Sequence, residues 1–153
     1  MFKKKFKVQA KWSAKKALDV SVNGRTHQVF IDDKSPLTVS AAKAFKGDDT
    51  KYNPEDLLLS ALTSCHMMSY FYVCAQHGIE LIDYIDEAIG VLELKADGSG
   101  AFTSVVLNPI VTISKVDMID KAVGLHKEAN KLCFIANSCN FPITHQSIVK
   151  AAQ

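Results

Sequence analysis

The chain has 153 residues, of which 48% are hydrophobic and 22% charged, with a formal net charge of +2. This length allows one domain with a core that needs no disulfide or metal, so we expect a single domain over residues 1–153. The small net charge does not indicate a nucleic-acid partner, and we expect none.

The chain starts with basic residues, Met1-Phe2-Lys3-Lys4-Lys5, but the apolar stretch of a signal peptide does not follow. We therefore expect a cytoplasmic protein. In such a reducing compartment, cysteine pairs are usually catalytic rather than structural. The four cysteines form no Cys-x-x-Cys motif, which argues against zinc ribbons and thioredoxin-type sites.

The first fifty residues predict short strands. Apolar residues alternate with lysines from Phe6 to Trp12, which predicts a half-buried edge strand with lysines on its wet face. A basic arm that binds nucleic acid is the alternative. The segments Ala17–Val22 and Thr26–Ile31 predict two more strands, joined by a tight turn at Asn23-Gly24.

Arg25, the only arginine of the chain, lies at the tip of this predicted hairpin. After it, Ser35 to Tyr52 predicts a loop with one short strand. No Lys, Arg, Asp or Glu occurs from Leu57 to Ile79. That length would also suit a membrane span, but Ser, Thr, His and Gln are scattered through the segment. We therefore expect a central helix buried on most sides, and no membrane partner.

Signals at both ends delimit this central helix. Asn53 is a suitable cap, Pro54 suits the first helical position, and Glu55 and Asp56 complement the helix dipole. Gly78 ends the helix.

The rest of the chain predicts a hairpin, a second helix and a strand. Ala88–Lys95 and Ala101–Ser114 flank a Gly-rich turn, and Asn108-Pro109 predicts a bend or bulge in the second strand. The second helix should run from about Asp117 to Cys133, and Phe141–His145 should form a last strand. We expect the inner face of this second helix to carry Ile119, Val123, His126, Ala129 and Cys133. This order of elements predicts one α+β domain.

Cys65 lies in the middle of the predicted central helix. A lone buried cysteine is usually a small hydrophobic residue, whereas peroxide chemistry needs a thiolate, a cation and a second thiol. Cys74 is about 13 Å further along the same helix, too far for a disulfide, and we expect it to fill the core. Cys133 and Cys139 remain as possible partners.

Two cysteine motifs resemble those of the OsmC/Ohr family, the osmotically induced and organic hydroperoxide resistance proteins. The first runs from Asn53-Pro54-Glu55 to Thr63-Ser64-Cys65, and the second is Ala129–Ser138 around Cys133. The resemblance implies an OsmC-like α+β fold: N-terminal antiparallel strands, a long central helix, a second β-hairpin, a second helix and a final strand. It also implies an intertwined homodimer.

The resemblance further implies a thiol peroxidase that reduces organic hydroperoxides without a cofactor. Cys65 would attack the peroxide and Cys133 would resolve the sulfenic acid as a disulfide, which an external dithiol reduces. Arg25 would hold the thiolate and the peroxide, with Glu55 orienting it. An apolar pocket would favour alkyl or lipid hydroperoxides, and we expect it to contain Leu62, Met68, Phe71 and Tyr72.

Two features depart from the family pattern. Phe134 follows Cys133 where many members have proline, and Cys139 is an extra thiol that could compete as resolver. In addition, Glu55 and Cys65 are ten residues apart, about 15 Å along a straight helix. In the intertwined dimer that the resemblance implies, Arg25 and Glu55 would instead serve the Cys65 of the other subunit.

Other functions are compatible with the same residues. A Cys-His hydrolase would need His126 or His145 near Cys65, since the adjacent His66 points about 100° away on a helix. A non-enzymatic module could bind an apolar ligand or sense redox state through buried cysteines. The histidines and cysteines do not show metal-ligand spacing, so we expect no metal.

Overall fold

The computed structural model describes residues 1–13 and 23–152. They form two compact units, Met1–Leu58 and Leu59–Gln153, and the boundary lies inside the helix α1 (Pro54–Gln76). The strand predicted at Ala17–Val22 lies outside the described residues. The mixture of strands and two helices confirms the α+β class.

The first unit contains an antiparallel sheet in the order β1 (Gln9–Lys11), β2 (His27–Phe30) and β3 (Leu37–Val39). β1 is an edge strand, as the lysine pattern predicts. All side chains of β1 are exposed, so within this unit β1 does not have the half-buried face that the sequence predicts. Arg25 ends a single 3-10 turn, η2 (Asn23–Arg25), immediately before β2.

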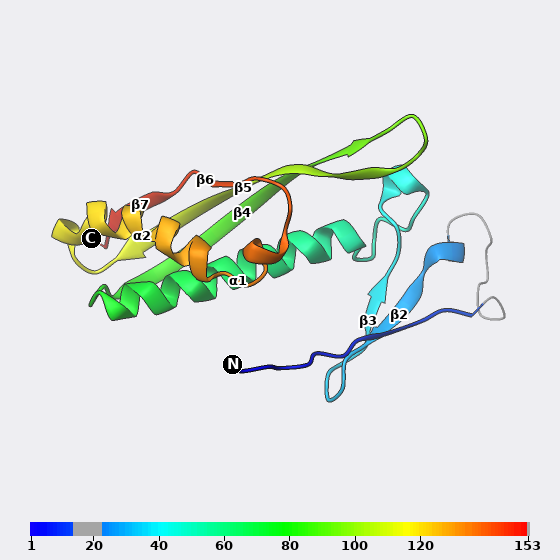
Figure 1. The fold of residues 1–153 in the computed structure, drawn as a ribbon, viewed down its shortest axis with the longest axis horizontal. Helices are drawn as coiled ribbons and strands as arrows, with labels where there is room; N and C mark the ends of the chain where they lie inside the picture. Colours follow the sequence, from blue (N-terminus) through cyan, green and yellow to red (C-terminus); the bar gives the residue numbers. More distant parts are fainter. Residues whose placement is uncertain (14–22, 153) are drawn as a thin grey trace. The chain divides into compact units, whose positions relative to one another are not determined.

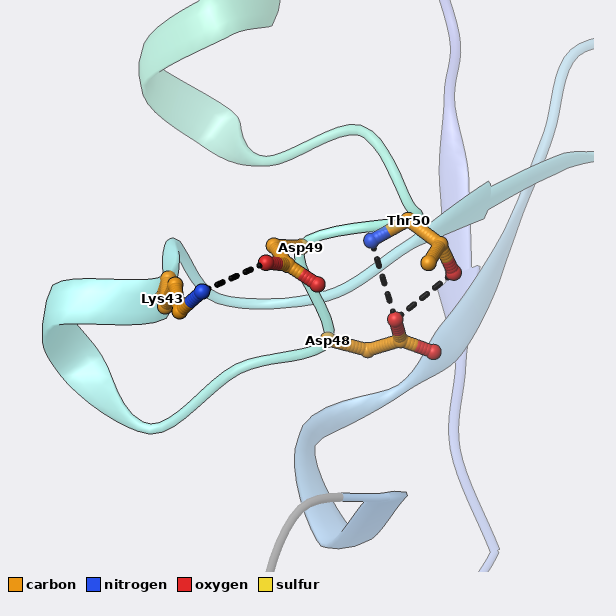
Figure 2. Close-up of polar contacts among 4 residues, drawn as sticks. All are labelled: Lys43, Asp48, Asp49 and Thr50. Carbon is orange, nitrogen blue, oxygen red and sulfur yellow. Dashed lines mark hydrogen bonds and ion pairs between the residues drawn. The ribbon is translucent and has the colours of Figure 1, made fainter.

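The loop between β3 and α1 is held by its own polar side chains, as Figure 2 shows. The Asp48 carboxylate accepts hydrogen bonds from the backbone N–H of Thr50 at 3.0 Å and from its hydroxyl at 2.7 Å. Lys43, in the short turn η3 (Lys43–Phe45), pairs with Asp49 at 3.0 Å. That ion pair is exposed and contributes little stability, so the Asp48 turn shapes the loop.

Both ends of α1 form as the sequence predicts. The Asn53 side-chain oxygen accepts a hydrogen bond from the Asp56 N–H at 2.8 Å, which is the geometry of an N-cap. At the other end Gly78 has φ 67°, a left-handed conformation that suits glycine. The Ile79 N–H then returns to the Cys74 carbonyl at 2.9 Å and closes the helix.

The burial expected on most sides of α1 is wrong for this chain. Only one stripe of the helix is buried: Leu62, His66, Tyr70, Val73 and Cys74. Met68, Phe71 and Tyr72 are exposed. In the described part of the chain, α1 is also long and apolar enough to cross a membrane, a test that core helices of soluble proteins pass as well.

The second unit contains a four-stranded sheet. Figure 1 shows its long hairpin of β4 (Leu81–Leu94) and β5 (Gly100–Ile113), which extends beside α1. β6 (Ile143–His145) and β7 (Ile148–Ala151) both pair in parallel with the other edge of β5. β4 starts seven residues before the predicted Ala88, and β7 is a strand that the sequence analysis missed.

The bend expected at Asn108-Pro109 does not occur. Pro109 pairs with Asp86 in an unbroken register, and the irregularities of the hairpin lie at Leu81/Asp83 and Val91/Leu92. The partners of β5 explain why proline is tolerated in this inner strand. β6 pairs with residues 105–107 and β7 with residues 110–113, so Pro109 lies in the gap between them.

The second helix, α2 (Ile119–Leu132), follows the short turn η4 (Val116–Met118), and Cys133 is its C-cap residue. Its buried face is Ala122, Leu125, His126 and Ala129. Of the predicted inner face, His126, Ala129 and Cys133 are buried and Ile119 packs against the core, whereas Val123 is exposed and was predicted wrongly. Tyr70 and Val73 of α1, Val111 and Ile113 of β5, and Ala122 of α2 share one core cluster. Both helices therefore pack on one face of the sheet.

Candidate active site

Cys65 opens into a hollow on the surface of the second unit. The hollow has a volume of about 330 Å³, and it is lined by Cys65, Met68, Ser69, Tyr72, Leu132 and Phe134. The α1 residues among these recur at i, i+3, i+4 and i+7, the spacing of one helix face. Met68, Tyr72 and Phe134 are 58%, 59% and 81% exposed, so the hollow has an apolar rim.

The hollow contains two of the four predicted pocket residues, Met68 and Tyr72. Leu62 is fully buried and packs in the core beside Cys133. Phe71 lines a separate hollow of about 470 Å³, where its ring meets Tyr84 edge-on at 5.6 Å.

Three lining residues were missed by the sequence analysis. Ser69 lies four residues after Cys65, so helix periodicity alone could have found it. Leu132 and Phe134 flank Cys133 and could have been found once the two cysteines were placed together.

Cys133 lies directly behind Cys65, in the protein interior. Its side chain is 0% exposed and packs with Leu62, Val105 and Leu107, and Cys65 packs against the same cluster. The Cys133 sulfur accepts a hydrogen bond from the Ala136 N–H at 3.3 Å. The structure thus brings together the two cysteines that the motifs single out.

The environment of Cys133 keeps its thiol protonated. Burial is the main cause that raises the pKa of Cys133 to about 11, and the neighbouring Cys65 thiol contributes in the same direction. The Ala136 N–H acts in the opposite direction and is outweighed. Cys133 is therefore a neutral thiol at physiological pH, without access to solvent.

The other two thiols are free as well. Cys74 is fully buried in the cluster around Tyr70, and burial raises its pKa, which confirms its expected role in the core. Cys139 follows the short turn η5 (Ala136–Ser138) and is half-buried, with its pKa also raised by burial.

Arg25 and Glu55 lie in the Met1–Leu58 unit, whereas Cys65 lies in the other unit. Arg25 is exposed in η2. Glu55 is the second residue of α1, and its Oε2 atom is buried without a hydrogen-bond partner among the described residues. Such a carboxylate oxygen needs a donor, and a guanidinium group would supply one.

A cluster of aromatic rings, which the sequence analysis did not predict, fills the space between α1 and α2. His66 Nε2 and His126 Nδ1 are 3.1 Å apart, a hydrogen-bonding distance, in a fully buried pair. His145 of β6 packs on His66 with ring centroids 4.3 Å apart. Tyr70 stacks on His126 at 3.9 Å, and its hydroxyl donates to the Ala122 carbonyl at 2.9 Å.

The buried imidazoles are neutral at physiological pH. The pKa of His66 is lowered to about 3 and that of His126 to about 4, mainly by burial and in part by the proximity of His145. Burial also lowers the pKa of His145. Because these rings bond and stack with one another, no hydrogen bond in the described part of the chain joins Cys65 to a histidine.

These shifts predict acid sensitivity. Unfolded histidines protonate below about pH 6.5 while the folded ones stay neutral, so stability is complete above that pH and falls with acidification. Between pH 7 and pH 5, His66 and His126 should each remove about 2 kcal/mol from the free energy of unfolding. Urea titrations at both pH values check this.

His77→Gln is the matched control for this prediction. His77 directly follows α1 and lies near the surface beside Glu128, outside the buried histidine cluster, so its removal should leave the loss of stability between pH 7 and pH 5 largely in place. Equal stability of the unmodified chain at pH 7 and pH 5 would contradict the neutral, buried state of the histidine pair.

Several solved structures share this fold. An OsmC-like protein of unknown function from Vibrio cholerae matches with a TM-score of 0.83 and 25% identity, over 95% of this chain and 100% of that one. An organic hydroperoxide resistance protein from Elizabethkingia anophelis matches with a TM-score of 0.70 and 20% identity, over 99% and 100% of the two chains. The organic hydroperoxide resistance protein OhrB of Bacillus subtilis matches with a TM-score of 0.63 and 20% identity, over 95% of this chain and 98% of that one.

No curated protein sequence shows significant similarity to this chain. The sequence nevertheless matches a family model, described as OsmC-like protein, over residues 47–147, which include α1, Cys65 and Cys133. This match covers well over half of the chain, and the fold agrees with it. The chain therefore belongs to the OsmC-like protein family.

Proposed function

We propose that this chain is a thiol peroxidase that reduces organic hydroperoxides to alcohols through a cycle of Cys65 and Cys133. One observation carries the proposal: a half-buried thiol at an apolar hollow packs in one cluster with a second thiol that is fully buried. Family membership and the fold shared with organic hydroperoxide resistance proteins support it.

In the first step, the Cys65 thiolate attacks the distal peroxide oxygen and the O–O bond breaks. The alkoxide leaves with a proton as the alcohol, and Cys65 becomes a sulfenic acid, oxidised by two electrons. Cys133 is not suited to this role, because its thiol is buried and protonated. Cys65 faces the hollow and is suited to it.

In the second step, Cys133 attacks the Cys65 sulfur and displaces its hydroxyl group. The Cys133 proton leaves with the hydroxyl as water, and a disulfide forms between the two cysteines. An external dithiol returns both cysteines to the thiol state by thiol–disulfide exchange. Such a cycle requires the reducing conditions of the cytoplasm, where we place the protein.

The lining of the hollow supports an organic peroxide as the substrate. Apolar surface is offered by Met68, Tyr72, Leu132 and Phe134. Ser69 adds a hydroxyl group to the lining. An alkyl or lipid chain gains free energy from such a surface, whereas hydrogen peroxide gains none. A redox sensor would form the same disulfide, but it would not turn over.

Replacement of Cys65 tests the assignment directly. Cys65→Ser should abolish the consumption of cumene hydroperoxide in the presence of a dithiol, because serine cannot form the sulfenic acid. The fold should persist, since Cys65 is half-buried and serine is close to it in size. Cys74→Ser would disturb the core, so Cys139→Ser is the matched control. Near-normal turnover by Cys65→Ser would end the peroxidase proposal.

The two late cysteines should behave differently. After one equivalent of organic hydroperoxide, the unmodified chain and Cys139→Ser should each lose two hydrogens, the mass change of a disulfide. Cys133→Ser should instead gain oxygen and reach the sulfinic acid under excess peroxide, because its sulfenic acid has no resolving thiol. Intact mass and peptide mapping distinguish these products. The reverse pattern would make Cys139 the resolving cysteine.

We further propose that the chain forms a homodimer in which Arg25 and Glu55 complete the site at the partner's Cys65. The family resemblance suggests this arrangement, and two features of the chain support it. Glu55 and Cys65 are separated by about 15 Å of helix. The buried Glu55 Oε2 also lacks a hydrogen-bond donor among the described residues. Closed two-fold symmetry would give two equivalent shared sites.

Mixed dimers test the shared site. Arg25→Ala and Cys65→Ser chains should each be nearly inactive, and unfolding and refolding them together should restore activity. Each mixed dimer then contains one intact site, whose arginine comes from the chain that lacks Cys65. A site built within one chain recovers nothing. The absence of recovery in confirmed mixed dimers would refute the shared site without affecting the role of Cys65.

A further inference from the structure

Buried polar contacts join α1 and α2 at two successive levels. His66 Nε2 and His126 Nδ1 lie 3.1 Å apart, and the Tyr70 hydroxyl donates to the Ala122 carbonyl at 2.9 Å. His66 and Tyr70 are one turn apart on α1, as are Ala122 and His126 on α2. The two levels therefore fix one antiparallel register between the helices.

The same register places the two reactive sulfurs. Cys65 immediately precedes His66 on α1, and Cys133 caps α2 two turns after His126. A disulfide requires Cα atoms within about 7 Å. The Cys133 and Cys65 side chains are within hydrogen-bonding contact, and a slide of one helix past the other by a single turn, about 5.4 Å, would break that contact.

A buried histidine pair stabilises a core less than apolar side chains of similar size would. The pair leaves His66 Nδ1 and His126 Nε2 without a partner among the described residues, and His145 Nε2 is in the same state. In either tautomer of the pair, one outer nitrogen keeps an unused proton and the other an unused lone pair. Burying polar atoms without a partner is destabilising, so leucine would stabilise this core better.

Unlike leucine, histidine can form a directional hydrogen bond. Apolar side chains pack in several registers at similar free energy, whereas the two nitrogens meet in only one. Ring contacts on both sides hold this orientation: Tyr70 stacks on His126 at 3.9 Å, and the tilted ring of His145 packs on His66 at 4.3 Å. Metal binding does not explain the cluster, since no three His, Cys, Asp or Glu side chains of the described residues are arranged for it.

We infer that His66 and His126 are positioning residues for the resolving step: their buried hydrogen bond sets the register of α1 against α2 that keeps Cys133 within reach of Cys65. Only the part of its test that uses a peroxide rests on the proposed function. Closure of the disulfide by any oxidant depends on the same register. The histidines do not touch the substrate, and they act through the placement of the two helices.

Paired variants test the inference. His126→Asn places an amide atom near the position of Nδ1, and His66→Gln places one near Nε2, so both should keep the hydrogen bond. His126→Leu and His66→Leu keep the volume and lose the bond. We expect disulfide formation after one equivalent of cumene hydroperoxide to slow at least ten-fold in the leucine variants. The amide variants should remain within about three-fold of the unmodified chain.

Two readouts separate positioning from general damage. In a Cys133→Ser background, the leucine variants should lose much less of the rate at which the Cys65 sulfenic acid forms, because α2 contributes only Leu132 to the lining of the hollow and no reacting atom to that step. His77→Leu is the matched control, since His77, in the turn directly after α1, also contacts α2 through Glu128 but lies outside the buried cluster. Its disulfide should form at the normal rate.

Oxidation by diamide tests the inference independently of peroxide chemistry. It takes two electrons and two protons from a dithiol, becomes the hydrazine and leaves a disulfide. If the chain does not reduce hydroperoxides, diamide closure of Cys65 and Cys133 should still show the ten-fold loss in the leucine variants. Normal closure in those variants, by either oxidant, would overturn the positioning role.

Direct observation of the bond covers the case in which the leucine variants do not fold. In the unmodified chain with nitrogen-15 histidine, NMR should detect a nitrogen–nitrogen coupling between His66 Nε2 and His126 Nδ1 across the shared proton. Neither ring should protonate down to pH 5. Rings without coupling, titrating at the usual histidine pKa, would refute the inference.

Discussion

One packing constraint governs the second unit: α1 can bury only one stripe of its surface against the inner face of β5. Leu62, His66 and Tyr70 form that stripe and face Val105, Leu107 and Val111. Cys65 is one residue, about 100°, away from the stripe. It is therefore half-buried, in contact with the core on one side and with the hollow on the other. A helix rotated by one position would bury the thiol completely or remove it from Cys133.

The same packing gives the four thiols different environments. Cys74 continues the buried stripe of α1 and has only core neighbours. Cys133 caps α2, so its sulfur lies where the helix ends and the next turn supplies the Ala136 N–H. Cys139 lies beyond that turn. Burial rather than sequence spacing is what distinguishes an accessible thiol from the protonated thiol behind it.

Local signals in the sequence were sufficient for the parts of the fold that local contacts determine. The Asn53 cap, the Gly78 end of α1 and the turn between β4 and β5 each depend on a few neighbouring residues, and all were predicted. The two cysteines of the proposed cycle were found because they stand in motifs, and the structure places them together.

Long-range packing determined what the sequence did not show. β7 is four residues long and exists through its parallel pairing with β5, a partner about forty residues earlier in the chain. Pro109 looked like a strand breaker because the gap between β6 and β7 is not visible locally. Phe71 is adjacent to Tyr72, yet helix geometry directs the two rings into different hollows. The histidine cluster joins three separate elements and has no spacing pattern.

The complete burial of Cys133 has a consequence for the reductant. In the proposed disulfide between Cys65 and Cys133, only the Cys65 sulfur would face the hollow, so an incoming thiol would attack there and expel Cys133. Cys133 is a poor leaving group because its thiol pKa is raised to about 11. Held beside the resulting mixed disulfide, it can also return and eject a monothiol. A dithiol escapes this reversal, because its second sulfur displaces the first and frees Cys65 as a thiol.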